Sequence, residues 1–240
     1  MNRDLLGSLR EEKETGLPGG IYHKLQIEMT YNSNHIEGST LTKEQTRYIF
    51  ETNTIDADKA LSVDDVVETA NHFRCIDMII DHAEEELTEK FIKKLHETLK
   101  NGTMDSRKDW FMVGDYKKIP NEVGGRETTA PSKVHSEVKT LLEAWINRVK
   151  PPKFEDIIEF HYQFEKIHPF QDGNGRIGRL VAFKECLKAG VVPFIIDEEL
   201  KLFYYRGLSE WETEKGYLLD TCRAGQDKVK AYLDYFKIRT

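Results

Sequence analysis

Apolar residues recur at helical spacing along most of the chain, and this periodicity limits the fold more than any other feature of the sequence. In residues 21–38, Ile21, Leu25 and Met29 lie on one side of a helix, and Gly38 is placed to end it. Similar patterns, several of them opened by a capping residue, cover residues 42–51, 62–86, 88–102, 132–149, 152–168, 174–190, 197–211 and 227–238. The sequence therefore predicts a mainly helical fold.

One segment departs from the helical pattern. Residues 115–131 contain short extended runs on either side of Gly124-Gly125, and Pro131 ends the segment. Two adjacent glycines are typical of the tight turn between antiparallel strands, because both central residues of that turn need a positive φ. We therefore expect one β-hairpin near 115–131 in an otherwise helical unit.

Charge and cysteine content disfavour several classes of protein. The 240 residues carry a formal net charge of −7, and a nucleic-acid partner would need a basic face, so we expect none; a local basic pocket for a small anion stays open. The cysteines Cys75, Cys186 and Cys222 form no CxxC pair, which favours reduced thiols and a cytoplasmic location. No apolar run has the length of about 20 residues that a membrane span needs, and no signal peptide is recognisable, so we expect no membrane partner.

The segment 168–180, HPFQDGNGRIGRL, concentrates residues that bind anions and loosen the backbone. Pro169 disfavours the α conformation at His168, so we expect a helix to end there. A second helix is expected to begin near Asn174. Between the two, the glycines let backbone N–H groups turn towards one point at a helix N-terminus, a setting that suits phosphate oxygens.

Charged side chains surround the same point. Arg176 and Arg179 are three residues apart, so they share a helix face and can reach one anion. Asp172 offers a hard oxygen of the kind that Mg²⁺ uses beside nucleotide phosphates. His168 lies four residues before Asp172, close enough to act as a base beside the same phosphate. Together these residues predict a phosphate site with Mg²⁺. The other histidines form no cluster with metal-ligand spacing, so the sequence does not indicate a histidine metal site.

From His168 to Arg179 the chain resembles the Fic family, whose motif H-x-F-x-[D/E]-G-N-G-R-x-x-R it matches at every fixed position. The resemblance covers roughly residues 86–225, including the predicted hairpin. It implies a mainly α fold, a Fic-type helical bundle with one β-hairpin flap over the active site. The implied organisation is an N-terminal helical region at 1–85, a Fic core at 86–225 with the flap near 115–131, and a C-terminal helix at 226–240, all packed as one compact unit.

The resemblance also implies an enzyme, a protein adenylyltransferase that moves AMP from ATP to a hydroxyl side chain of a target protein, with Mg²⁺ bound. His168 would deprotonate the hydroxyl, Asp172 would hold the metal, and Phe170 would anchor the loop in the core. The residues implied to bind ATP here are Asp172, Gly173, Asn174, Gly175, Arg176, Ile177, Gly178 and Arg179, with an anion hole at 173–175, Arg176 on the triphosphate and Arg179 on the γ-phosphate. Related kinases depart from G-N-G-R, so the intact motif favours nucleotidyl transfer.

Two further regions are implied to face the nucleotide. The hairpin would hold a segment of the target protein by strand addition. The residues implied to line the nucleotide are Val123, Gly124, Gly125 and Arg126 in the hairpin, and Tyr204 and Tyr205, which resemble a tyrosine pair on the adenine side in relatives. Each interpretation has an open alternative: an ordinary surface hairpin, and an aromatic pair in the helical core.

A second match lies in the predicted helix at 21–38. Ser33 and Glu37 are four residues apart, just before Gly38, and fit the family's inhibitory motif [S/T]-x-x-x-E-[G/N]. By resemblance, Glu37 would pair with Arg179, withdraw it from the γ-phosphate and leave ATP unproductively bound. The sequence thus predicts an autoinhibited enzyme, in which the same glutamate could also position water for the removal of AMP.

Other functions stay open at this point. The chain could mainly remove AMP, or transfer another nucleotide-linked or phosphate group. It could also be a non-catalytic, nucleotide-sensing interaction module, although a pure binding module has no need of the base His168. We further expect self-AMPylation, and a homodimer is open.

Overall fold

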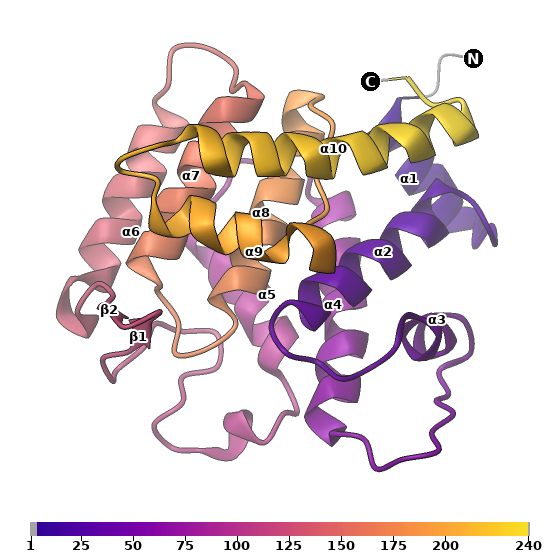
Figure 1. Ribbon diagram of the computed structural model, residues 1–240, viewed down its shortest axis with the longest axis horizontal. Coiled ribbons are helices and arrows are strands. Elements are labelled where there is room, and N and C mark those ends of the chain that lie inside the picture. Colours follow the sequence, from indigo (N-terminus) through magenta and orange to yellow (C-terminus); the bar gives the residue numbers. More distant parts are fainter. Residues whose placement is uncertain (1–3, 240) are drawn as a thin grey trace.

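The structure is a computed structural model that describes residues 4–239. Its helices surround a central helix, α8, and a small β-hairpin lies at one side of the bundle (Figure 1). The elements are α1 (Leu5–Thr15), α2 (Ile21–His35), α3 (Lys43–Thr52), α4 (Val63–Asp81), α5 (Glu89–Lys100), the 3₁₀ turn η1 (Asp105–Arg107), β1 (Glu122–Val123), β2 (Arg126–Glu127), α6 (Pro131–Ile146), α7 (Phe154–Ile167), α8 (Asn174–Ala189), α9 (Glu198–Ser209) and α10 (Gly216–Phe236). This arrangement confirms the predicted mainly helical fold with one hairpin.

The central position of α8 follows from its sequence. Of its 16 residues, 13 are buried, and the helix contacts α7, α4, α5 and α2. A helix that is engaged on all sides belongs in the interior of a bundle. It begins after Gly173 and ends before Gly190, both with positive φ, as the glycine positions predict. Its N-terminal turn is therefore held inside the bundle, within reach of side chains from its neighbours.

The N-terminal helices are part of the same unit. α2 packs against α4, α8 and α10, and the buried Leu25 and Ile79 share one apolar core with Leu180 of α8. A backbone bridge between Asp4 and Arg239 brings the two ends of the described chain side by side (Figure 1). Within residues 4–239, none of the helices combines the length and the apolar character that crossing a membrane requires.

The sequence patterns do not predict α1. Its signals are local: the side chain of Asp4 accepts a hydrogen bond from the Gly7 N–H at the start of the helix, and Leu5 and Leu9 are buried four residues apart. Gly7 in the first turns obscures the pattern, because glycine is a poor helix former.

The predicted boundary before a C-terminal helix at 226–240 is wrong. α10 runs without a break from Gly216 to Phe236. Gly225 does not end a helix here. It lets α10 approach another segment closely, since a Cβ at this position would lie 2.7 Å from the carbonyl oxygen of Ile195. The predicted helix at 62–86 is also shorter, because α4 ends at Asp81.

The end of α2 is closed by Gly38, although the regular helix stops at residue 35. The Ser39 N–H donates to the carbonyl of Asn34 over 3.1 Å, and Gly38 has φ 101. This is the hydrogen bond of a Schellman motif, in which a glycine takes the left-handed position. Ser33 thus lies on the last turn of α2, and Glu37 lies in the closing turn just beyond it.

The hairpin is present in a short form. β1 and β2 pair antiparallel, with Val123 opposite Arg126. Gly124 and Gly125 form the turn with φ 56 and 75, as the predicted turn requires. Because each strand has two residues, contacts at the base of the hairpin must contribute to its position.

Candidate active site

The loop between α7 and α8 carries the predicted base in a constrained conformation. His168 has φ 52 and ψ 61, a left-handed conformation that few residues other than glycine adopt, and Pro169 follows. Asn174 closes the loop: its Oδ1 accepts from the Phe170 N–H over 2.7 Å, and its Nδ2 donates to the Phe170 carbonyl over 2.8 Å. Sparsely populated backbone conformations held in this way are typical of functional sites.

A buried histidine of α5 supports the loop, and sequence reasoning missed it. The ring of His96 stacks on the fully buried Phe170, with ring centroids 3.9 Å apart. Its Nδ1 accepts from the Gly114 N–H over 2.9 Å, and its Nε2 donates to the Asp172 carbonyl over 3.2 Å. Burial lowers the pKa of His96 to about 3, so the ring is neutral with its proton on Nε2. In the sequence, His96 lies on the apolar face of its predicted helix, so nothing distinguishes it from an ordinary core residue.

The first turn of α8 offers free backbone donors. The N-cap residue is Gly173, at φ 80, and no side chain caps the helix. The first N–H groups of a helix have no partner within the helix itself. Together with the helix dipole, such groups can bind an anion. Phosphate binding by Gly173, Asn174 and Gly175 stays a prediction.

Asp172 belongs to a network of charges that is built around two buried cations. Its Oδ2 accepts from Lys100 Nζ over 2.7 Å and from Arg176 Nη2 over 3.2 Å. Glu68 of α4 pairs with the same two cations, and Asp105 pairs with Lys100 over 3.2 Å. Because the side chains of Lys100 and Arg176 are 3% and 6% exposed, each buried charge needs such partners. Sequence reasoning missed Lys100 and Glu68, since the charged faces of their helices are typical of solvated surfaces.

Asp172 has the properties of a Mg²⁺ ligand. Burial alone would raise its pKa, but the cations of Arg176 and Lys100 lower the pKa to about 2, so the carboxylate is ionised at neutral pH. Its side chain is half-exposed, and one carboxylate is typical of Mg²⁺ bound to nucleotide phosphates. In the described part of the chain, no three His, Cys, Asp or Glu side chains could hold a metal ion by themselves. A metal at Asp172 would therefore also need phosphate oxygens.

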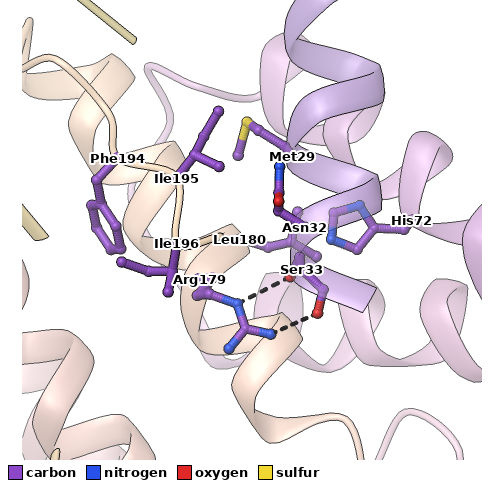
Figure 2. A pocket seen from close by; sticks show the side chains of 9 residues that line it. All are labelled: Met29, Asn32, Ser33, His72, Arg179, Leu180, Phe194, Ile195 and Ile196. Atoms are coloured by element: carbon purple, nitrogen blue, oxygen red, sulfur yellow. Dashed lines mark hydrogen bonds between the residues drawn. The ribbon is translucent and has the colours of Figure 1, made fainter. Parts of the chain in front are cut away.

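Arg179 is bound by the end of α2 (Figure 2). Its Nε donates to Ser33 Oγ over 3.0 Å, and its Nη2 donates to the Ser33 carbonyl over 3.0 Å. Nη2 also donates to Glu37 Oε1 over 2.7 Å. The side chain is 8% exposed. Burial alone would lower the pKa of Arg179, but the carboxylate of Glu37 raises it above its ordinary value. The predicted contact between Glu37 and Arg179 is thus present in the structure.

Two glycines of α8 make room for carboxyl groups beside Arg179. A Cβ added at Gly175 would overlap with Oε1 of Glu37, and a Cβ added at Gly178 would overlap with Oε1 of Glu165 from α7. Burial raises the pKa of Glu165 to about 8, so its neutral form predominates at pH 7. Among the described residues, neither Glu165 Oε1 nor Arg179 Nη1 has a hydrogen-bond partner. Arg179 therefore lies near two carboxyl groups and pairs with one of them.

A small cavity lies between α2 and α8 (Figure 2). Its volume of about 20 Å³ has the size of one water molecule. The lining residues are Met29, Asn32, Ser33, His72, Arg179, Leu180, Phe194, Ile195 and Ile196. Nδ1 of His72 hydrogen-bonds to Thr30 Oγ1 over 2.9 Å, and burial lowers the pKa of His72 to about 3. The contact between α2 and the core therefore contains buried polar side chains and a space for one water molecule as well as apolar contacts.

The base of the hairpin is fastened to the loop that follows α7. The Lys117 N–H donates to the Pro169 carbonyl over 2.9 Å, and Asn121 Nδ2 donates to the Phe170 carbonyl over 3.1 Å. Lys117 Nζ donates to Asn121 Oδ1 over 2.7 Å and to Thr128 Oγ1 over 2.6 Å, which joins the two arms. The hairpin and the loop therefore form one assembly.

The imidazole of His168 is held in its neutral form. Burial lowers its pKa to about 4, and the positive charge of Lys117 acts in the same direction. A backbone hydrogen bond at Glu165 and the charges of Glu37 and Asp172 have the opposite effect. A neutral ring can accept a proton, as a general base must.

The tip of the hairpin reaches α9. Val123 is exposed, and Nη1 of Arg126 donates to the carbonyl of Ser209 over 2.7 Å. The hairpin thus spans from the loop after α7 to the C-terminus of α9. The structure carries no nucleotide, so a contact of residues 123–126 with ATP stays a prediction.

The two tyrosines of α9 differ in their surroundings. Tyr204 is 1% exposed and hydrogen-bonds to His161 Nε2 over 2.7 Å, so it is a core residue, and the prediction that it lines the nucleotide is wrong. The cause is the helical spacing, which turns it inward towards α7. Tyr205 is partly exposed, and its hydroxyl donates to the carbonyl of Ile36 over 3.0 Å.

The fold and the site define a helical domain in which a β-hairpin, a glycine-rich loop and the first turn of a central helix lie together. The model of the Fic/DOC family matches residues 86–185, which contain the hairpin and the whole loop. The chain is 30% identical over 186 residues to the protein adenylyltransferase Fic of Drosophila grimshawi, with 74% of this chain and 36% of that protein covered. It is 28% identical over 183 residues to that of Aedes aegypti, with 75% and 36% covered. The chain belongs to the Fic family.

Solved structures agree with this assignment. A Fic domain containing signaling protein from Bacteroides thetaiotaomicron aligns with a TM-score of 0.70 and 28% identity, over 96% of this chain and 90% of that one. Fic-1 from C. elegans aligns with a TM-score of 0.73 over 97% of this chain and 72% of that one; at 20% identity it supports the fold alone. The chain spans a little more than a third of the length of the two insect relatives.

Proposed function

We propose that this chain is a protein adenylyltransferase that moves AMP from Mg-ATP to a hydroxyl side chain of another protein. The proposal is supported by one observation above all: a neutral base, an ionised carboxylate and two arginines meet at the uncapped first turn of α8. Transfer of a phosphorus group depends mainly on positioning and charge neutralisation, and these groups supply both. The relatives named protein adenylyltransferase support the same activity.

In the proposed reaction, the oxygen of the target hydroxyl attacks the α-phosphorus of ATP. The new O–P bond forms as the bond from the α-phosphorus to the bridging oxygen breaks, and pyrophosphate leaves with that electron pair. The hydroxyl proton passes to the neutral ring of His168. With a pKa of about 4, His168 is free to accept this proton at neutral pH.

The remaining groups bind and orient the triphosphate. Asp172 would hold Mg²⁺, which neutralises phosphate charge when it is bound. The N–H groups after Gly173 would bind phosphate oxygens, and Arg176 would donate to the triphosphate while Glu68 holds it in place. Transfer would then depend on the orientation of the α-phosphate towards the base.

In the proposed resting form, Glu37 inhibits the enzyme. Its carboxylate occupies the space above Gly175 and takes a donor of Arg179 that the γ-phosphate would need. A bound triphosphate would therefore be misplaced relative to His168. Withdrawal of Glu37 would free both the arginine and the space in front of the helix.

The target segment would lie along the hairpin. In the described residues the sheet has two strands, so each strand has one edge without a strand partner, and such an edge can accept an extended segment. We place the protein in the cytoplasm, where its three free, buried cysteines would stay reduced.

The test is to incubate the protein with Mg²⁺ and ATP that carries the label on either the α- or the γ-phosphate. We expect protein-bound label from the α-position only, and more of it with the Glu37→Gly variant. Label from the γ-position only would mean a kinase, and label from neither position would leave a nucleotide-binding module. The His168→Ala variant is the control, because it should still bind Mg-ATP but incorporate no label.

A further inference from the structure

Lys117 carries a buried positive charge that the described chain does not neutralise. Its side chain is 3% exposed, and its ammonium donates to two neutral oxygens, of Asn121 and Thr128. The other two buried lysines differ, because Lys100 and Lys184 each bind carboxylates. Burial lowers the pKa of Lys117 to about 8, and no acid among the described residues raises it in compensation. A buried charge that is kept without a counter-ion calls for an explanation.

The position of Lys117 links this charge to the base. Its own N–H donates to the carbonyl of Pro169, the residue after His168. The charges that act on His168 come from three places: Lys117 at the base of the hairpin, Glu37 in the turn after α2 and Asp172 in the loop. Glu165 of α7 acts through a backbone hydrogen bond, and its own carboxyl group is mainly neutral at pH 7. Of these groups, Lys117 is the cation. A cation near an imidazole disfavours the protonated ring.

We propose that Lys117 is a positioning residue whose charge, added to the effect of burial, disfavours the protonated form of His168, and that it does so only while the hairpin is seated. The second part follows from the anchors of the ammonium. Asn121 and Thr128 lie on the two arms of the hairpin, so loosening either arm lets the charge move away from the ring or become hydrated. The hairpin thereby acts on the base as well as on the target segment. This inference rests on the proposed function only in taking His168 as the base.

The decisive variants are Lys117→Met, which removes the charge at similar length, and Lys117→Arg, which keeps it. The protonation of His168 is followed directly by NMR of labelled histidine in the full chain, where His168→Ala identifies its signal among the eight histidines. We expect the titration midpoint of His168 to rise by at least about 0.5 pH unit in Lys117→Met and to stay unchanged in Lys117→Arg. Equal midpoints in the wild type and Lys117→Met would overturn the proposal.

A third variant separates charge from architecture. Thr128→Val removes one anchor of the ammonium but leaves the ammonium in place, so the midpoint of His168 should shift less than in Lys117→Met. A shift as large as that of Lys117→Met would mean that loosening of the hairpin, and not the charge, is the cause, and this result would also overturn the proposal.

The rate of AMP incorporation gives an independent readout. In the Glu37→Gly background, the acidic limb of the pH–rate profile should move to higher pH for Lys117→Met by the same amount as the NMR midpoint. If the midpoint shifts but no variant incorporates AMP at any pH, the proposed function is wrong and the effect of Lys117 on His168 still stands.

Discussion

Glu37 and Arg179 lie 142 residues apart in the chain and are joined by a hydrogen bond of 2.7 Å at the first turn of α8. The arginine is buried, and the same guanidinium also donates twice to Ser33. The turn after α2 and the first turn of α8 are thus locked together through a single side chain.

Replacing Glu37 by glycine should activate the enzyme. The change frees Nη2 of Arg179 and clears the space above Gly175, so the initial rate of α-label incorporation should rise about tenfold or more, a change that needs only ~1.4 kcal/mol. Ser33→Ala removes one acceptor of the same arginine and should give a smaller increase. The rates are measured at saturating Mg-ATP.

The background of Arg179→Ala decides whether the effect passes through this arginine. A double-mutant cycle measures the coupling of two residues in contact. Glu37→Gly should activate the wild type and do little when Arg179 is alanine. Equal activation in both backgrounds would contradict a regulatory role of this ion pair.

Replacing Asp172 by asparagine should weaken metal binding. Because the pKa of Asp172 is lowered to about 2, the wild-type carboxylate is available at all pH values near neutrality. Calorimetry with Mn²⁺ and ATP should show a loss of metal affinity of about tenfold or more. Asp105→Asn is the matched control, since it removes an acid from the same lysine, Lys100, without removing the proposed ligand. An equal loss in both variants would mean that the charge network, and not Asp172, governs metal binding.

Replacing His96 by alanine should destabilise the whole domain. The change removes a ring stacked on Phe170 and leaves the Gly114 N–H and the Asp172 carbonyl without their partner. A cavity of this kind together with unpaired polar groups costs about 3–5 kcal/mol of unfolding free energy. Urea unfolding followed by circular dichroism measures this value. A cost below ~1 kcal/mol would show that the loop does not depend on His96.

The free energy of unfolding should fall as the pH falls below about 6.5. Four histidines have lowered pKa values in the folded state, about 3 for His72, His96 and His161 and about 4 for His168. Between these values and about 6.5 the unfolded chain binds more protons, so acid favours unfolding by about 1.4 kcal/mol per histidine and pH unit. Glu165 has the opposite effect, because its raised pKa of about 8 means that the folded protein binds this proton more tightly than the unfolded chain. It is one group against four histidines.

Urea midpoints measured from pH 7 to pH 5 test this dependence. His72→Gln is the control, because glutamine can still hydrogen-bond to Thr30 but takes up no proton. Its midpoint should depend less steeply on pH than that of the wild type. The same slope in both proteins would show that His72 does not remain neutral in the fold.

The sequence predicts the contacts that belong to a fixed motif. The loop from His168 to Arg179 and the helix after it are present, because proline and glycine at fixed positions set their boundaries. The pair of Glu37 with Arg179 is present as well, but only the resemblance to the Fic family predicts it, since no local spacing connects the two residues. The hairpin is predicted as well, since two adjacent glycines force its turn.

The groups that support the loop could not be predicted in this way. Glu68 comes from α4, His96 and Lys100 come from α5, and Lys117 comes from the base of the hairpin. Each has the local pattern of an ordinary surface or core residue of its segment. Their role arises only when the segments pack, because buried charges and ring nitrogens are then forced to find partners. Tyr204 shows the same limit, since helical spacing alone does not say which side of α9 faces the core.

Gly178 shows how this architecture restricts change over evolution. The carboxyl group of Glu165 occupies the space that any larger side chain at 178 would need. A side chain added at 178 would force the end of Glu165 to move and would also lie only 3.1 Å from the ring of His161. Shortening the acid at 165 first removes the closer of these two obstacles. We therefore expect residues 165 and 178 to vary together among relatives of this chain, with a bulkier residue at 178 appearing only where 165 is small.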